Sequence, residues 1–348
     1  MSTFHKLTIK DITKETSDAV SITFDIPTDL QNDYSFVAGQ YITIKTEING
    51  EEVRRAYSLC SSPKSGIVKV AVKAVENGTF SVYANEKLNP GDALEVSAPE
   101  GKFVLTPEAN KKYIGFVAGS GITPVLAMVK SVLESDTNAT FTLVYGNKTI
   151  TDTIFYNELE ALKTQYSNQL QVNYVLSREN IEGNVFGRID KGHVNYFVKN
   201  IYKDITFDKA FLCGPEEMIN TASETLAENG FDKTNILFEL FTASVDEEAS
   251  SNVKDGETEM TVILDDEEVT VTVSQKDNIL SASLRNQIDA PYSCQGGICS
   301  SCIAKITEGK AMMVKNHILT EEEVNDGIVL TCQAHPTTPK ITVDFDDV

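Results

Sequence analysis

The sequence lacks several features that would assign it to a large class of proteins. No apolar run approaches the roughly eighteen residues that a membrane-spanning helix needs, although apolar residues make up 41% of the 348. The N-terminus, Met1-Ser-Thr-Phe-His-Lys6, contains no apolar export segment, and the chain has neither an internal repeat nor a low-complexity tract. We therefore expect a soluble, cytoplasmic protein of two or three domains.

Basic residues are also scarce. The chain has 30 Lys and Arg against 51 Asp and Glu, which gives a net charge of −21. Residues 258–348 carry 15 acidic and 6 basic residues, a larger acidic excess than that of the first 241 residues. This balance argues against nucleic-acid binding, which rewards basic patches, and it suits docking to a partner with a basic surface. Solubility alone would explain the charge equally well.

Cysteine is the residue type whose placement is most informative. The segment Cys294-Gln-Gly-Gly-Ile-Cys299-Ser-Ser-Cys302 spaces three thiols as C-x4-C-x2-C, and Cys332 follows after a longer interval. This is the spacing of a plant-type [2Fe–2S] cluster, which is held by four thiolates. The pattern therefore predicts an iron–sulfur cluster in the last quarter of the chain.

A zinc site and disulfides are the alternatives for these cysteines. Structural zinc usually uses two C-x2-4-C pairs, and only Cys299 and Cys302 form one here. Disulfides require an oxidising compartment, which the missing export segment does not favour. Gly296 and Gly297 favour the cluster, because glycine tolerates positive φ and lets backbone N–H groups approach the sulfides. Cys60 lies in no such pattern, and we expect it to be structural.

The chain divides into four segments by its pattern. Residues 1–107 are short alternating strands separated by turns, which predicts an antiparallel β-barrel. In residues 108–241 apolar runs alternate with helical stretches, which predicts an α/β domain with a mostly parallel sheet. Residues 242–257 are polar and acidic, so we expect a mobile linker. Residues 258–348 add a predicted hairpin, a short helix and the cysteine loop, which indicates a small α+β domain.

The predicted barrel contains an R-x-Y-S string. Alternation along a strand points Arg55 and Tyr57 to one face, where a guanidinium and an aromatic ring can meet one ligand. A flavin offers both matching surfaces, a flat isoalloxazine and a phosphate, and Ser58 could hydrogen-bond its reactive edge. An ordinary amphipathic strand is the alternative. Downstream, Gly78-Thr79-Phe80-Ser81 begins a predicted helix whose free N–H groups and Ser81 hydroxyl can receive a pyrophosphate.

Two strand-to-helix junctions of the α/β segment are candidates for nucleotide binding. The first, from Gly119 through Gly121 and Thr123 to Pro124, has two glycines where dinucleotide sites need close backbone approach, but Pro124 replaces the third glycine. A plain turn is the alternative. The second junction is Cys213-Gly214-Pro215, at the carboxyl end of another strand, where ligands gather in α/β sheets. Its alternative is a buried cysteine followed by an ordinary helix start.

Two further positions in this segment carry expectations. Ser177 and Arg178 end the third strand, where the adenosine ribose would lie, and an arginine there suits a 2′-phosphate. Lys148 could add to that positive charge, so the two basic residues favour NADPH over NADH. Glu179, beside Arg178, adds an opposite charge. Glu239, at the end of the final strand, is expected to face the flavin.

With these motifs in this order, the whole chain resembles the ferredoxin–NADP reductase superfamily, in particular the members with a C-terminal plant-type ferredoxin domain. The segments 313–323 and 330–336 resemble the reductase components of oxygenases. The resemblance implies an FAD-binding barrel, an NADPH domain and a ferredoxin domain of the β-grasp type. It also implies flavin contacts from Arg55, Tyr57, Ser58 and Ser81, and nucleotide contacts from Gly119, Thr123, Arg178 and Cys213.

The implied activity is transfer of electrons from NADPH through FAD and the [2Fe–2S] cluster to a partner oxygenase. The cofactors carry the redox chemistry, so we expect the residues to position cofactors and none to act as a catalytic acid. Alternative acceptors are a fatty-acyl desaturase and a steroid or aromatic-ring hydroxylase. An interpretation of another class is a non-enzymatic redox-sensing or electron-storing module, which the intact flavin and nucleotide motifs disfavour.

Overall fold

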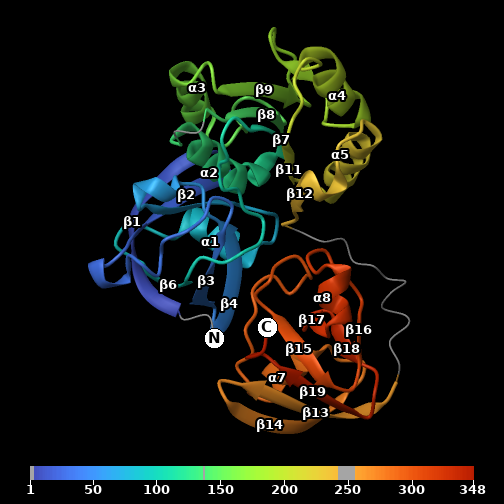
Figure 1. The fold of residues 1–348 in the computed structure, drawn as a ribbon. Helices are drawn as coiled ribbons and strands as arrows, with labels where there is room; N and C mark the ends of the chain where they lie inside the picture. Colours follow the sequence, from blue (N-terminus) through green and yellow to red (C-terminus); the bar gives the residue numbers. More distant parts are fainter. Residues whose placement is uncertain (1–3, 136–137, 242–254) are drawn as a thin grey trace. The chain divides into compact units, whose positions relative to one another are not determined.

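The computed structural model describes residues 4–135, 138–241 and 255–348. Contacts divide the chain into two compact units, one from Phe4 to Phe241 and the other in the C-terminal part (Figure 1). The predicted linker, 242–257, lies outside the described residues except for its last three, and Glu257 already begins a strand.

A six-stranded antiparallel sheet forms the first half of the N-terminal unit (Figure 1), with the strand order β4-β3-β6-β1-β2-β5. Asn49 and Gly50 join β3 to β4 with φ angles of 57° and 84°, as a two-residue hairpin turn requires. Alternate side chains such as Ile42 and Ile44 point into the core of this sheet. Its elements are β1 (Phe4–Thr16), β2 (Ala19–Asp25), β3 (Tyr41–Ile48), β4 (Glu51–Ser58), β5 (Val68–Lys73), α1 (Thr79–Glu86) and β6 (Ala93–Ser97).

A six-stranded parallel sheet forms the second half of this unit. Its strand order is β10-β9-β8-β7-β11-β12, and every pair in it is parallel. The connections run outward in one direction from β7 and in the other direction from β11. Its strands are β7 (Lys112–Ala118), β8 (Thr140–Asn147), β9 (Leu170–Leu176), β10 (Val185–Phe186), β11 (Lys209–Cys213) and β12 (Ile236–Glu239). Its helices are α2 (Ile122–Leu133), α3 (Tyr156–Gln165), α4 (Lys191–Asn195) and α5 (Glu216–Glu228).

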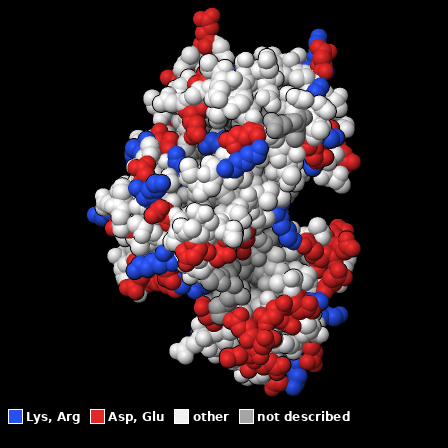
Figure 2. All heavy atoms as spheres, turned by 60° about the vertical axis from the view of Figure 1, so that its left-hand side comes forward, with Lys and Arg blue, Asp and Glu red and all other residues white. Residues whose placement is uncertain are grey.

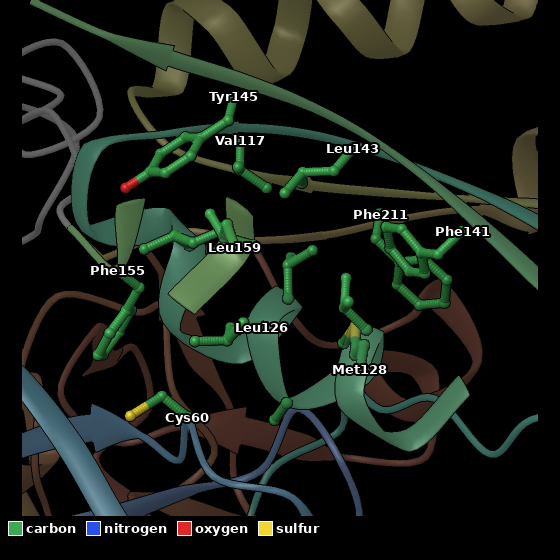
Figure 3. Packing of buried hydrophobic residues seen from close by; sticks show 14 of the residues in the cluster. Cys60, Val117, Leu126, Met128, Phe141, Leu143, Tyr145, Phe155, Leu159 and Phe211 are labelled. Carbon is green, nitrogen blue, oxygen red and sulfur yellow. The ribbon is translucent and has the colours of Figure 1, made fainter. Parts of the chain in front are cut away.

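Helix α2 lies where the two halves of the N-terminal unit meet. Ten of its twelve residues are buried, so it is covered on nearly all sides, unlike a surface helix with one apolar stripe. Figure 3 shows Leu126 and Met128 of α2 in one core with Phe141 and Phe211 of the parallel sheet. Cys60, which follows the barrel strand β4, belongs to the same core. The barrel and the α/β half therefore share a continuous apolar interior.

The C-terminal unit is built on a five-stranded mixed sheet with the order β14-β13-β19-β15-β17. β13 pairs parallel with β19, and the other pairs of this sheet are antiparallel. Asn278 caps the helix α7 through its side chain, which accepts the N–H of Ser281. The strands are β13 (Glu257–Leu264), β14 (Glu267–Ser274), β15 (Ile303–Glu308), β16 (Ala311–Met313), β17 (Ile328–Leu330), β18 (Ala334–Pro336) and β19 (Lys340–Asp344), and the helices are α7 (Ile279–Arg285) and α8 (Glu321–Asn325).

The predicted fold class is confirmed, with differences in detail. The helix expected around 190–201 is α4 followed by a π-helical segment, Tyr196–Ile201. The long strand β1 was not predicted, because most of its residues are polar and only a few, such as Leu7 and Ile9, are buried. The short strands from β15 to β19 were not predicted either, since runs of three to six residues give little periodicity. None of the described helices is both long and apolar enough to cross a membrane.

Candidate cofactor sites

Strand β4 carries the predicted flavin residues Arg55 and Tyr57. Arg55 is exposed and Tyr57 is partly buried, and the two side chains lie close together. Burial raises the pKa of Tyr57, and the nearby positive charge of Arg55 acts in the opposite direction. The Tyr57 ring is held by Phe80 of α1, with 5.5 Å between ring centroids. The arrangement presents a fixed ring and an exposed guanidinium, which fit a planar ligand that carries a phosphate.

The start of α1 is the second part of the predicted flavin site. A Cβ on Gly78 would lie 2.2 Å from Ser81 Oγ and 2.6 Å from a methyl group of Val75, so any other residue there would displace these side chains. Ser81 Oγ accepts the N–H of Val75 at 3.3 Å, which keeps the hydroxyl hydrogen available as a donor. Within the described chain no side chain caps this helix, and Thr79 is exposed at its first turn. Its N-terminal N–H groups are therefore free to bind an anion.

The two nucleotide junctions meet at the point where the strand order of the parallel sheet reverses. A Cβ on Gly121 would lie 2.2 Å from the carbonyl oxygen of Cys213, so the first junction touches the second directly. Gly119 has a φ of +55°, and its carbonyl accepts a hydrogen bond from Tyr145 Oη at 2.9 Å. Thr123 donates to the Ser120 carbonyl at 3.1 Å. The crevice at the carboxyl ends of β7 and β11 is where open α/β sheets bind nucleotides.

The residues after these contacts complete the junctions. Pro124 lies in the first turn of α2, where its missing N–H costs no helical hydrogen bond, which explains why it can replace a glycine. Gly214 allows the second junction to pass close to Ala118, since a Cβ there would lie 3.2 Å from it. Pro215 precedes α5 directly and is its N-terminal flanking residue.

Ser58, Cys213 and Glu239 meet at this crevice although they lie far apart in the sequence. Cys213 and Glu239 are paired residues of β11 and β12, and Ser58 Oγ donates to a carboxylate oxygen of Glu239 at 3.1 Å. Burial raises the pKa of Glu239 to about 8, and the hydrogen bond from Ser58 lowers it by a smaller amount. Burial, and then the charge of Glu239, raise the pKa of Cys213, so this thiol stays protonated at neutral pH. The site can hold one proton on the carboxyl group next to the barrel strand.

The predicted 2′-phosphate residues lie together beyond the adjacent strand ends. The N–H of Arg178 donates to the carbonyl of Lys148 at 2.9 Å, so the two exposed cations sit on neighbouring loops. Ser177 is tied to the same loop through Asn147. The carboxylate of Glu179 accepts the N–H of Ile150 at 2.8 Å.

One feature of this region was missed by the sequence interpretation. Phe186, on the short edge strand β10, is 57% exposed, the most of any phenylalanine in the described chain. Its strand pairs with β9 just before Ser177 and Arg178. A two-residue strand leaves no periodic signal, so the sequence did not single out Phe186.

The four cysteines of the C-terminal unit lie together as two pairs. The thiol of Cys294 is hydrogen-bonded to that of Cys299, and the thiol of Cys302 to that of Cys332, and all four cysteines are free thiols. The second pair forms because β15 and β17 are antiparallel neighbours, with Ile303 opposite Leu330. The N–H and hydroxyl of Thr331 both donate to the carbonyl of Cys302, at 3.0 and 2.9 Å.

The loop between the first two thiols supports a negatively charged sulfur. The pKa of Cys294 falls to about 6, mainly through the hydrogen bond from Cys299 and with help from three backbone N–H groups, including that of Gly296 at 3.3 Å. Positive φ occurs at Gly297, as expected, and at Gln295 rather than at Gly296, whose N–H nevertheless approaches the Cys294 sulfur as expected. Ser293, 1% exposed, has a hydroxyl for which no partner exists among the described residues.

These observations fit a binuclear iron–sulfur cluster. No three His, Cys, Asp or Glu side chains of the described residues surround a single ion position, which a tetrahedral zinc site would require. In a [2Fe–2S] cluster two cysteines bind each iron and sulfides complete its coordination, so two pairs of thiols are what the cluster needs.

Comparisons with known proteins agree with the geometry. Three family models match: an oxidoreductase FAD-binding domain over 6–105, an oxidoreductase NAD-binding domain over 116–224 and a 2Fe-2S iron-sulfur cluster binding domain over 262–337. The chain is 40% identical over 351 residues to a component of the 1,2-phenylacetyl-CoA epoxidase of Escherichia coli (strain K12), covering 99% of both chains. It is 32% identical over 354 residues to the 3-ketosteroid-9-alpha-monooxygenase, ferredoxin reductase component, of Rhodococcus rhodochrous, covering 97% of this chain and 96% of the relative.

A solved structure matches the whole chain as well. Phthalate dioxygenase reductase superposes with a TM-score of 0.62 at 21% identity over 98% of each chain, which shows a shared fold. Fold and site together define an oxidoreductase of the ferredoxin reductase type, with FAD, NAD and [2Fe–2S] domains in that order. The chain belongs to the ferredoxin–NADP reductase superfamily, in the branch with a C-terminal plant-type ferredoxin domain whose members are reductase components of oxygenases.

Proposed function

We propose that this reductase uses NADPH and FAD and serves an oxygenase related to the phenylacetyl-CoA epoxidase. The observation that carries the proposal is the contact of Ser58 with Glu239, because it brings the strand suited to flavin against the crevice suited to nicotinamide. When bound, the flavin takes two electrons as hydride and releases them singly, and the cluster accepts one at a time.

The flavin would be held by side chains and N–H groups of the barrel. Tyr57 covers its ring, Arg55 pairs with phosphate, and the start of α1 supplies N–H groups to the pyrophosphate. Ser58 is placed to contact the edge of the ring that faces the nucleotide crevice. The residues assigned to the flavin are Arg55, Tyr57, Ser58, Gly78, Thr79 and Ser81.

The nucleotide would be held at the switch point of the parallel sheet. The loop before α2 approaches the pyrophosphate through its backbone, and the second junction borders the nicotinamide. The exposed Phe186 offers a surface for the adenine. The residues assigned to the nucleotide are Gly119, Gly121, Thr123, Pro124, Ser177, Arg178, Cys213, Gly214 and Pro215.

Glu239 would hold a proton near the reacting rings. Below its pKa of about 8 the carboxyl is protonated, and it can accept the Ser58 hydrogen bond while donating its own proton. Glu239 is thus assigned a positioning role, and Cys294, Cys299, Cys302 and Cys332 are assigned to the cluster.

The partner is proposed to be an oxygenase with a basic docking surface. The support is the 40% identity over nearly the whole chain to the epoxidase component, together with the acidic excess after residue 257. Figure 2 shows acidic side chains crowded on the visible surface of the C-terminal unit. A steroid hydroxylase is the second candidate, because the Rhodococcus rhodochrous relative serves one and is 32% identical. Both acceptors would be cytoplasmic, which is where we place this chain.

Reconstitution distinguishes these partners. The purified reductase and NADPH are mixed with the oxygenase proteins of an epoxidase in one experiment and with those of a ketosteroid hydroxylase in another. In each mixture, the NADPH oxidation that is coupled to product formation is measured. Coupled turnover with the epoxidase alone supports the proposal. Coupling only to the steroid enzyme would replace the partner while leaving the electron path intact.

A further inference from the structure

A largely buried lysine of the nucleotide domain is hydrogen-bonded to the barrel immediately after the flavin strand. Lys130 Nζ, on α2, donates to the carbonyl oxygen of Cys60 at 2.9 Å and lies 2.7 Å from a carboxylate oxygen of Glu158 on α3. Its side chain is 12% exposed. Burying a charge is costly unless it is paired and hydrogen-bonded. Lys130 meets both conditions, because Glu158 of the α/β half pairs with it and the Cys60 carbonyl of the barrel half accepts its hydrogen bond.

Each end of this connection leads to a cofactor-binding segment. Cys60 follows Ser58 by two residues, and α2 starts directly after the Gly119 to Gly121 loop. Lys130 therefore joins the strand that would contact the flavin to the helix that carries the nucleotide loop. The position of Cys60 is fixed by two contacts. Its N–H donates to the carbonyl of Lys69 at 2.9 Å, and its side chain is fully buried in the same apolar core as α2 (Figure 3).

Two further contacts reinforce the same junction. Lys64 Nζ donates to the carbonyl of Glu134, just beyond the end of α2, at 2.6 Å. The Ser62 hydroxyl donates to the carboxylate of Glu134. The barrel segment 60–64 thus holds the last turn of α2 and the residue that follows it. On the other side of the crevice, the Ser58 to Glu239 contact fixes the first end of the same barrel segment.

Hydride transfer is sensitive to such a junction. The donor and acceptor atoms must approach to about 3–3.5 Å, and a displacement of about 1 Å can cost about 100-fold in rate. A shift of α2 relative to Cys60 would move the nucleotide loop relative to the flavin. The contacts between that loop and the nucleotide would stay nearly the same, and so would the affinity for the nucleotide.

We propose that Lys130 is a positioning residue for the reductase reaction: it fixes α2 against the barrel so that the bound nicotinamide reaches the flavin. The proposal rests on the proposed electron path. It predicts a change in the rate of flavin reduction that is not matched by a change in nucleotide affinity. It also predicts a change in the protection of backbone amides from hydrogen exchange at this junction, which can be measured without turnover.

The test uses Lys130→Met, which keeps the length of the side chain and removes its charge, in the full-length protein loaded with FAD and cluster. Lys163→Met is the control, because Lys163 forms an exposed pair with Glu160 on α3, at 3.4 Å. Limiting flavin reduction by NADPH is measured by anaerobic stopped flow, affinity for NADP+ by calorimetry, and amide hydrogen exchange over residues 59–64 and 126–134. We expect the limiting rate to fall about 10-fold or more with little change in affinity, because the misplacement is geometric. Exchange should accelerate in both segments, and the control should match the wild type in every measurement.

Two further variants keep the test decisive. Lys130→Arg retains the charge and should recover most of the rate. Lys130→Met combined with Glu158→Gln removes the carboxylate that the single change leaves unpaired, so it should restore thermal stability but not the rate, and it carries the test if the single variant does not fold. A wild-type rate in flavin-loaded Lys130→Met, or a rate that returns together with stability in the double variant, would overturn the proposal. If NADPH does not reduce the flavin of the wild-type protein, the proposed electron path is wrong. Hydrogen exchange would still report whether Lys130 holds the junction together.

Discussion

The cluster site of the C-terminal unit draws three of its four thiols from nine consecutive residues, whereas the nucleotide crevice of the N-terminal unit joins segments far apart in the chain. In the cluster loop, the hydrogen bond from Cys299 and then backbone N–H groups within a few residues of Cys294 lower the pKa of its thiol. In the crevice, Gly121 lies against Cys213, and Ser58 reaches Glu239 across 181 positions. A site built locally depends on its loop, and a site built from distant segments depends on the packing of whole domains.

The largest expected effect is the loss of the cluster from the C-terminal unit. Cys332→Ser should abolish the [2Fe–2S] cluster, because one iron would lose a thiolate from the pair that Cys302 and Cys332 form. Flavin reduction by NADPH should persist, since the two sites lie in separate units. Iron content and the visible absorbance of the cluster are measured, with Cys60→Ala as the control that keeps the cluster. A fully loaded cluster in Cys332→Ser would contradict the ligand assignment.

Glycine substitutions sharpen the same comparison. Gly121→Ala would place a Cβ 2.2 Å from the Cys213 carbonyl, and moving packed backbone of this kind costs about 1–3 kcal/mol, so NADP+ should bind about 10- to 100-fold more weakly by calorimetry. Gly296→Ala is the matched control in the cluster loop, because the nearest atom to its Cβ would be 3.8 Å away. It should leave both cluster content and nucleotide affinity unchanged. Equal affinities for wild type and Gly121→Ala would mean that the two junctions can separate freely.

Charge recognition at the adenosine end should have an effect of similar or smaller size. Arg178→Ala removes an exposed guanidinium next to Lys148, and a charge-assisted hydrogen bond to phosphate is worth about 1.5–3 kcal/mol, so KM for NADPH should rise about 10-fold or more. KM for NADH should stay the same, because NADH has no 2′-phosphate. Arg188→Ala, another exposed arginine of the same domain, is the control. A parallel rise for both nucleotides would remove Arg178 from the specificity site.

The smallest effect concerns the proton on Glu239, and it appears as a pH dependence. The folded state raises the pKa of this carboxyl from 4.5 to about 8, so folding favours its protonated form. The stabilisation is complete below about pH 4.5 and is lost as the pH rises to about 8. The thermal midpoint of the wild type should therefore fall more between pH 5 and 9 than that of Glu239→Gln.

The control for this prediction is Glu217→Gln, an exposed residue in the first turn of α5. It should follow the wild type across the whole range. The rate of flavin reduction is measured over the same pH values, and a change near pH 8 that survives in Glu239→Gln would assign the titration to another group.

The comparison also explains what the sequence could predict. The cluster ligands and the order of the three domains follow from local spacing and periodicity, and the alternating residues Arg55 and Tyr57 share a face because a strand requires it. The Ser58 to Glu239 hydrogen bond has no local signal, since it depends on how the barrel packs against the parallel sheet. The same holds for Lys130, which on the sequence is an ordinary helix lysine.

Errors within the sites have equally local causes. Positive φ was expected at Gly296 and Gly297 from their residue type, and the loop adopts that conformation at Gly297 and at Gln295 but not at Gly296, whose N–H donates to the sulfur of Cys294. Glu179, which is expected to weaken the charge of Arg178, accepts the N–H of Ile150 through its carboxylate, a contact that the sequence did not predict. Both depend on the path of a loop, which composition does not specify.

The decisive measurement is anaerobic stopped-flow absorbance of the loaded protein mixed with NADPH and, separately, with NADH, with the released flavin identified by chromatography. We predict that NADPH rapidly bleaches the flavin bands and then the cluster bands, faster than NADH does, and that the flavin is FAD. If the flavin bleaches while the cluster stays oxidised, electrons do not pass between the two units, and the proposed path from nucleotide to partner is wrong.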